Sequence, residues 1–270
     1  MSKRWTTEEK NTLKTLYNSK LYSYSEIAIK LNRSITSIKI KCSRYKILNS
    51  ETSNQMTSLS HRKYSINDLF FSIPNPLCSY WAGFMASDGN ISQKKARMTL
   101  ALKTNDKHQL EKFKKDLQYT GPIKDYIYNK KDRIQYISYL TFHSYQIKKD
   151  LLKNYNLTPN KSLTLISPPN LDDTNTLAFI IGLIDGDGSI YNKKCPYGNY
   201  YAINLTGTYS ICKFFKDNID KWLNLNKGPS IFPAKKVFKI DYGGKLKSEL
   251  IFKKLKSINL PRLDRKWLNV

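Results

Sequence analysis

The sequence predicts an α+β protein in which two pseudo-symmetric repeats, each with the order helix–strand–strand–helix–strand–strand–helix, follow a small three-helix domain. Two observations lead to this prediction. An apolar stretch that ends in Asp-Gly occurs twice, and its two copies are 99 residues apart, as Asp88 and Asp187 show. After each copy the apolar residues alternate with others, which is typical of strands. We therefore divide the chain into residues 1–48 (three-helix domain), 49–75 (linker), 76–167 (first repeat) and 168–270 (second repeat).

Residues 1–48 are predicted to form a basic helical domain. They hold 11 Lys and Arg against 3 Glu, a net charge of +8. Thr6 and Glu9 have the spacing of a capping box at the start of a first helix. Ser25 is expected to begin a second, short helix, and Ser34 to cap a third that runs to about Ile47.

The third of these helices has a polar stripe that is available to a DNA major groove, formed by Ser37, Lys41 and Arg44. The domain resembles the Myb/SANT-like helix-turn-helix family through Trp5-Thr6, Glu8-Glu9, Glu26-Ile27-Ala28, Leu31 and Arg33-Ser34. The resemblance implies DNA binding. SANT-like units also bind proteins, so a protein-interaction domain is the alternative, and the local charge favours DNA.

The segment from 49 to 75 is rich in Ser, Thr and Asn, which predicts a linker. It can serve as a solvated tether or lie along a phosphate backbone, and the tether is the simpler interpretation. Pro74 and Pro76 end it before the first apolar stretch.

The two apolar stretches are predicted to be helices that pack against each other. Ser79 and Gly83 in the first stretch, and Ala178 and Gly182 in the second, are spaced four residues apart. Each pair belongs to a strip of small residues on one side of its helix, where another backbone can approach closely.

This packing places Asp88 and Asp187 side by side at the C-terminal ends of the two helices. A helix C-terminus carries a partial negative charge, so two carboxylates there repel the dipoles and each other unless a cation joins them. We therefore predict a divalent metal site. The alternative is that Asp-Gly only terminates each helix, but two copies at one offset favour the metal.

The remaining elements are predicted from the period of the apolar residues. Residues 98–103 alternate, so one side of a strand is apolar and the other side, with Lys103, can face a ligand. Asn105 or Asp106 is expected to cap a helix that Gly121-Pro122 ends. The first repeat continues with strands near 123–128 and 134–142 and a helix near 144–155; the second has strands near 200–206, 230–232 and 236–242 and helices near 209–225 and 245–258.

The composition favours a nucleic-acid partner. The chain has 46 Lys and Arg against 21 Asp and Glu, a net charge of +25, and 40% apolar residues that can still build cores. Its four cysteines form no C-x-x-C pair, and its three histidines are widely separated, which disfavours a zinc cluster and histidine-based nuclease chemistry. No apolar N-terminal signal segment is recognised. We expect an intracellular monomer without a membrane partner, in the cytoplasm of a bacterial or phage-infected host or in an organelle.

Trp81 to Gly89 and Ile180 to Gly188 resemble the two motifs of single-chain LAGLIDADG homing endonucleases. The second copy is close to the signature, whereas the first has Ala86 in place of the first acidic residue. The resemblance covers roughly residues 75–270. It implies two LAGLIDADG repeats that form a saddle over double-stranded DNA, and hydrolysis of both strands across the minor groove. The target would be long and asymmetric, and the products would have short 3′ overhangs.

The resemblance assigns the metal site to Mg²⁺ or Mn²⁺. In the family the eighth motif position is the metal-binding acid, and Asp88 and Asp187 occupy it here. Carbonyl groups near Ser87 and Gly186 would complete the site.

The resemblance also implies further site residues. Lys161 and Lys266 follow comparable turns at the ends of the two repeats and match the basic residues that polarise water and stabilise the phosphate. Ordinary surface lysines are the alternative. Thr104 and Thr206 are expected to end equivalent strands, at a position where the family often has a polar residue that orients water.

Two other functions are compatible with this sequence. An RNA maturase could use the same fold to assist intron splicing, and a transcription regulator could bind DNA without cleaving it. Because both motif aspartates are present, the sequence favours the endonuclease over the regulator.

Overall fold

The computed structural model describes residues 4–19, 21–44, 62–130, 133–196 and 198–268. It begins with three helices: α1 (Thr7–Ser19), α2 (Tyr24–Lys30) and α3 (Ile35–Arg44). They enclose a hydrophobic core of their own, formed by Leu13, Tyr17, Tyr24, Ile27, Ala28, Ile38 and Cys42. The predicted end of the third helix near Ile47 lies outside the described residues. The bundle is thus a domain with a core separate from that of the repeats.

Reciprocal side-chain caps begin the first two helices of this bundle. Thr6 N donates to Glu9 Oε2 at 2.8 Å and Glu9 N donates to Thr6 Oγ1 at 3.1 Å, as the predicted capping box requires. The second helix begins after Ser23 and not at Ser25. Ser23 Oγ accepts from Glu26 N at 3.1 Å, and Glu26 Oε2 accepts from Ser23 N at 2.7 Å. The glutamate three residues further on therefore selects Ser23 as the cap.

Residues 62–75, which the sequence alone placed in the linker, pack against the first repeat. Thr120 N donates to Ser65 O at 3.1 Å, and Ser65 N donates to Thr120 Oγ1 at 2.9 Å. Phe71 is fully buried in the core of the repeats. The folded repeat region therefore includes residues 62–75, and residues 49–61 of the predicted linker lie outside the described ranges.

Both repeats have the predicted order of elements. The first consists of α5 (Pro76–Ser87), β1 (Gly89–Ile91), β2 (Arg97–Lys103), η1 (Thr104–Asp106), α6 (Lys107–Asp116), β3 (Ile123–Lys130), β4 (Arg133–His143), α7 (Tyr145–Tyr155) and η2 (Lys161–Leu163). The second consists of α8 (Asp173–Asp187), β5 (Gly188–Lys193), β6 (Tyr200–Gly207), α9 (Tyr209–Trp222), β7 (Phe232–Ala234), β8 (Val237–Tyr242), α10 (Lys245–Lys256) and α11 (Asp264–Trp267). The chain therefore has an α+β fold built from two αββαββα repeats.

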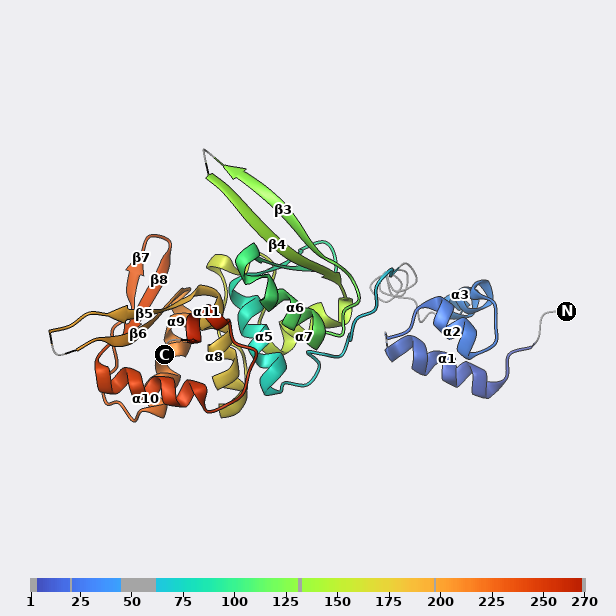
Figure 1. Ribbon diagram of the computed structural model, residues 1–270. Helices are drawn as coiled ribbons and strands as arrows, with labels where there is room; N and C mark the ends of the chain where they lie inside the picture. The colour runs from blue at the N-terminus through green and yellow to red at the C-terminus, as the bar shows by residue number, and fades with distance from the viewer. Residues whose placement is uncertain (1–3, 20, 45–61, 131–132, 197, 269–270) are drawn as a thin grey trace.

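Each repeat has an antiparallel sheet of four strands, in the order β1-β2-β4-β3 and β5-β6-β8-β7. The strand β2 alternates as predicted, because Met98, Leu100 and Leu102 are buried and the residues between them are not. Its buried side faces the core, so the other side of the sheet is open. The two sheets share one continuous core with α5 and α8, which lie side by side where the repeats meet (Figure 1).

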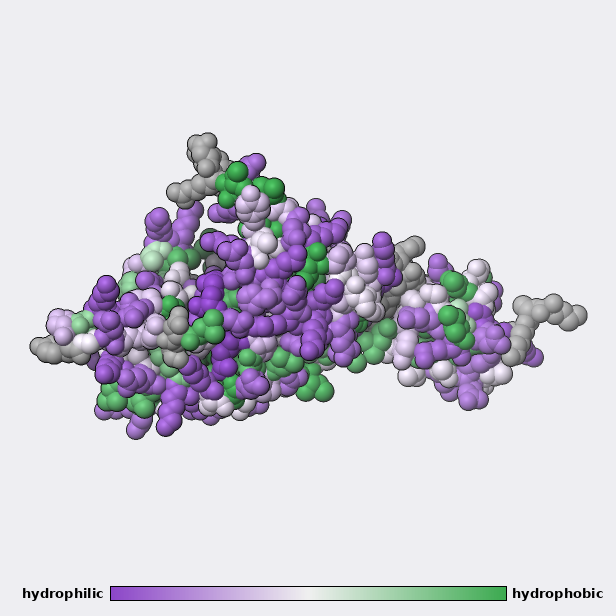
Figure 2. Space-filling model, in the orientation of Figure 1, coloured by the Kyte–Doolittle hydropathy of each residue, from purple (hydrophilic) through white to green (hydrophobic). Residues whose placement is uncertain are grey.

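The face of the molecule seen in Figure 2 is covered mainly by hydrophilic side chains. Apolar side chains gather towards the end of the β3–β4 hairpin (Figure 2), and two isoleucines of these strands, Ile127 and Ile134, are 61% and 63% exposed. Among the described residues, no helix is long and apolar enough to cross a membrane.

Candidate functional site

The two motif helices touch backbone to backbone. A Cβ atom built on Gly83 would lie 2.1 Å from the carbonyl oxygen of Phe179, and one on Gly182 would lie 2.1 Å from that of Tyr80. Ser79 and Ala178, the other two residues of the predicted strips, are fully buried. The side chain of Ser79 also hydrogen bonds across the interface, to Asn175 Oδ1 at 3.1 Å. The small residues thus allow α5 and α8 to approach closely enough to align their C-terminal ends.

The structure brings Asp88 and Asp187 together at these ends. Asp88 is the C-cap of α5 and Asp187 is the last residue of α8. Asp88 Oδ2 lies only 3.5 Å from the position that a Cβ atom on Gly186 would occupy. Desolvation, followed by repulsion from Asp187, raises the pKa of Asp88 to about 6. Desolvation also raises the pKa of Asp187, against the opposing charges of Lys161 and Lys266 and a hydrogen bond from Ser87. Both carboxylates are still open to solvent, so a cation can reach them.

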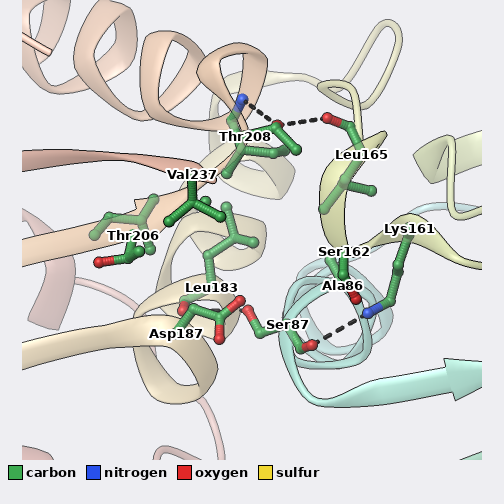
Figure 3. Close-up of a pocket in the computed structure, with 13 residues that line it drawn as sticks. Ala86, Ser87, Lys161, Ser162, Leu165, Leu183, Asp187, Thr206, Thr208 and Val237 are labelled. Atoms are coloured by element: carbon green, nitrogen blue, oxygen red, sulfur yellow. Dashed lines mark hydrogen bonds between the residues drawn. The ribbon is translucent and has the colours of Figure 1, made fainter. Parts of the chain in front are cut away.

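Both candidate lysines are directed at backbone carbonyl groups of this site. Lys161 Nζ donates to Ser87 O at 3.1 Å (Figure 3), and Lys266 Nζ donates to Gly186 O, also at 3.1 Å. Desolvation lowers the pKa of both ammonium groups, to about 8 for Lys266, while the aspartates oppose the change. The two carbonyl groups predicted as metal ligands are thus each hydrogen bonded by one lysine, and each oxygen has a second lone pair for another partner.

A cavity of about 220 Å³ opens beside Asp187. Lys161 and Ser87 from the first repeat lie on one side of it, and Asp187 and Thr206 from the second repeat lie on the other (Figure 3). The site therefore combines residues of both repeats.

The strand register shows that the residue of the first repeat that corresponds to Thr206 is not Thr104. Leu100 lies opposite Gly89, and Leu205 lies opposite Gly188, so these two leucines correspond. The counterpart of Thr206 is then Ala101. Thr104 lies in η1, where its hydroxyl accepts a hydrogen bond from Ser138 Oγ at 3.2 Å. The expected equivalence of Thr104 and Thr206 is therefore wrong, because the hairpin between β5 and β6 is longer than that between β1 and β2.

The predicted stripe on α3 is partly used within the bundle. The ammonium group of Lys41 lies 5.7 Å from the centre of the Trp5 ring, and Ser37 is half-buried. Arg44 is exposed at the end of the helix. Arg33, between α2 and α3, forms an ion pair with Glu9 of α1, with 2.9 Å between Arg33 Nη2 and Glu9 Oε2.

Asp185, which the sequence patterns did not identify as a site residue, anchors the C-terminal segment. Asp185 is 1% exposed, and its carboxylate accepts hydrogen bonds from Tyr80 Oη at 2.8 Å, Leu263 N at 2.9 Å and Trp267 Nε1 at 2.6 Å. An acidic residue inside an otherwise apolar helix was the signal available in the sequence. Its counterpart in the first repeat is Ala86.

The donor set fits a magnesium or manganese ion. Within the described ranges no three His, Cys, Asp or Glu side chains cluster as metal ligands, so a cation here would rely on the two aspartates with carbonyl, water or phosphate oxygens. Mg²⁺ is commonly bound through one or two carboxylates and substrate phosphates. The pKa of Asp88 is raised first by desolvation and then by the charge of Asp187, and a bound cation would oppose both effects.

This charge arrangement predicts a pH-dependent effect of Mg²⁺ on stability. With its pKa raised from 3.8 to about 6, folded Asp88 binds more protons than unfolded Asp88 between these values. In EDTA this group therefore adds stability as the pH falls through 6, and above pH 6 the ionised pair is open to Mg²⁺. At about ten times its Kd, Mg²⁺ should raise the melting temperature by about 3–6 °C at pH 7.5.

Differential scanning fluorimetry at pH 7.5 and pH 5 checks this expectation. The shift should shrink at pH 5, and Asp88→Asn should lose it at both values. A shift of equal size in Asp88→Asn would show that Mg²⁺ binds elsewhere.

No protein-family model and no curated protein matches the chain. Solved structures with similar folds include full-length DUF199/WhiA from Thermatoga maritima, with 15% identity, a TM-score of 0.47, and coverage of 70% of this chain and 60% of that one. The homing endonuclease I-WcaI, bound to its DNA recognition sequence, has 16% identity, a TM-score of 0.49, and coverage of 70% and 84%. The LAGLIDADG homing endonuclease I-LtrWI, bound to target DNA, has 15% identity, a TM-score of 0.46, and coverage of 75% and 88%. The chain thus spans less than two thirds of the full-length WhiA protein.

Proposed function

We propose that this protein is a metal-dependent, site-specific double-strand DNA endonuclease of the LAGLIDADG type that acts as an intracellular monomer. The observation that carries the proposal is the convergence of Asp88 and Asp187, one from each repeat, at two aligned helix ends. Two pseudo-symmetric repeats offer similar surfaces to the two antiparallel strands of a duplex. A single chain can therefore present one acid to each strand.

The side chains of the site have distinct roles in hydrolysis. Asp88 and Asp187 would hold Mg²⁺ or Mn²⁺, which lowers the pKa of bound water and stabilises charge on the leaving oxygen. Lys161 lines the same cavity as Asp187, where a positive charge would stabilise a phosphate. In the reaction water gives up a proton to the solvent as its oxygen binds phosphorus, the P–O3′ bond breaks, and the 3′ oxygen takes up a proton from the solvent.

The open sheet faces provide polar side chains for DNA. Arg97, Thr99 and Lys103 lie on the side of β2 that faces away from the core, and Thr206 has this orientation on β6. The net charge of +25 supports phosphate binding across the surface. Antiparallel ribbons with such side chains can read base edges in the major groove.

Incubation of the 270-residue chain with a plasmid library of randomised inserts tests the proposal. In Mg²⁺ or Mn²⁺ we expect linear plasmid, whose sequenced ends define one long target and short 3′ overhangs. EDTA should abolish the product. Target binding without cutting in either metal would favour the non-cleaving regulator, and faster splicing of an intron RNA would favour the maturase.

We further propose that the N-terminal bundle is a second DNA-binding domain. Its core is separate from that of the repeats, and its helix α3 presents Arg44 to solvent. A tethered second domain raises the local concentration and binds additional phosphate groups. A fragment of residues 62–270 should therefore still cut but bind more weakly.

The salt dependence of binding measures this contribution. The slope of log K against log salt should become shallower by about 0.9 for each phosphate group that the fragment no longer neutralises. Arg44→Ala should reproduce part of the change. Lys10→Ala, which removes one positive charge from α1, is the matched control. Identical footprints and identical slopes for the full chain and the fragment would identify the bundle as a protein-interaction domain.

A further inference from the structure

The two lysines of the site are held in different ways. Lys266 Nζ donates to the carbonyl oxygens of Ile184, Asp185, Gly186 and Gly188, at 2.8, 2.7, 3.1 and 2.7 Å. An ammonium group has three protons, so all of them are directed at the C-terminal end of α8. A cation at this end also opposes the negative end of the helix dipole. Lys266 therefore caps the helix that carries Asp187.

Lys161 has a different environment. Within the part of the chain that the structure describes, its ammonium group makes one hydrogen bond, to Ser87 O at 3.1 Å. The residue lines the cavity beside Asp187 (Figure 3). Two of its protons are therefore available to a water molecule or a phosphate oxygen in that cavity.

The C-terminal segment holds Lys266 in its capping position. On either side of this lysine, Arg265 pairs with Asp106 of the first repeat at 2.9 Å, and Trp267 donates to Asp185 at 2.6 Å. Lys112 of α6 donates to the carbonyl oxygen of Arg262 at 3.1 Å. Movement of the Lys266 ammonium group towards a substrate would break its hydrogen bonds to the carbonyl groups at the end of α8, while the backbone around it is held by contacts with both repeats.

The strand beside each aspartate adds a second difference. Thr206 lines the cavity next to Asp187, and the register places Ala101 at the corresponding position of the first repeat. A threonine hydroxyl can donate and accept a hydrogen bond, whereas an alanine methyl can do neither.

We infer that the two halves of the site are unequal, and that the DNA strand bound beside Asp187 is cut before the strand bound beside Asp88. Lys161 and Thr206 act on the first strand, whereas Lys266 is a positioning residue that caps α8. This inference rests on the proposed endonuclease function. Each strand still undergoes the same hydrolysis, with water added across the P–O3′ bond.

Single-turnover cleavage of a target duplex with a different dye on each strand tests the order. The wild-type protein should nick one strand at least about ten times faster than the other. Lys161→Met and Thr206→Ala should both slow that same strand selectively. The matched exchange, Ala101→Thr, should speed the other strand. Because the variants identify the strand, the orientation of the protein on DNA need not be known beforehand.

Thermal unfolding in EDTA tests the role of Lys266 without metal or DNA. Lys266→Met should lower the melting temperature by about 4–8 °C, because four carbonyl groups lose the hydrogen bond from its ammonium group. Lys161→Met should change it by less than about 2 °C, because it removes one hydrogen bond together with a poorly hydrated charge. At 25 °C, where it is still folded, Lys266→Met should slow the strand beside Asp187 at least as much as the other strand, because the end of α8 carries Asp187.

Several results would overturn the inference while leaving the proposed function intact. These are equal rates for the two strands, selective loss of the second strand in Lys266→Met, and a larger loss of stability in Lys161→Met than in Lys266→Met. If the wild-type protein binds but never cuts DNA in Mg²⁺ or Mn²⁺, the proposed function fails, and the inferred order of cleavage fails with it.

Discussion

Asp187→Asn and Asp88→Asn are each expected to reduce double-strand cleavage by a factor of about a thousand or more, because each removes one of two carboxylates available to the cation. Asparagine keeps the shape of the side chain but has no charge. Affinity for DNA in EDTA should be equal or slightly higher, since a negative charge near the phosphates is removed. Single-turnover rates in Mg²⁺ and binding curves in EDTA separate the two effects.

Asp173→Asn is a matched control for these variants. Asp173 is the first residue of the same helix, its side chain is 67% exposed, and it pairs with Lys221. Its replacement should change neither cleavage nor binding. In EDTA, Asp187→Asn should be at least as stable as the wild type, because it removes a desolvated charge from a repelling pair. Undiminished cutting by either Asp88→Asn or Asp187→Asn would remove these residues from the metal site.

Gly182→Leu is expected to unfold the repeats or abolish both DNA binding and cleavage. A Cβ atom at this position would lie 2.1 Å from the carbonyl oxygen of Tyr80 and 2.7 Å from the backbone nitrogen of Phe84. Backbone atoms cannot move aside as a side chain can, so α5 and α8 would have to separate. We expect a loss of more than about 4 kcal/mol, a large part of the stability of a typical domain. Urea unfolding followed by circular dichroism measures this loss.

Gly243→Ala is the control for this substitution. A Cβ atom on Gly243 would lie 3.4 Å from its nearest neighbour, the hydroxyl of Tyr200, which is an ordinary contact. Its effect on stability should stay within about 0.5 kcal/mol. Gly83→Leu should behave like Gly182→Leu, because its Cβ atom would lie 2.1 Å from the backbone of Phe179. Wild-type stability in Gly182→Leu would contradict the observed helix contact.

Local patterns in the chain predicted most of the architecture. The Thr6–Glu9 capping box and the alternation in β2 depend on residues close in sequence, and both are present in the structure. The order of elements in the two repeats follows from the same periodicity. The approach of α5 and α8 was predictable because small residues repeated on one side of each apolar helix favour close packing of the two backbones.

Contacts between residues distant in sequence could not be predicted in this way. The equivalence of Thr206 and Ala101 depends on strand register, which the lengths of two hairpins set and which no local pattern records. The capping role of Lys266 depends on a C-terminal segment that folds back onto α8. There the ammonium group contacts the carbonyl group of Asp185, a residue 81 positions earlier in the chain. Periodicity specifies which side of an element is apolar, whereas hydrogen bonds between distant segments form only after the core has brought them together. The positions of the two aspartates therefore follow from the sequence, and the difference between the two lysines follows from the tertiary structure alone.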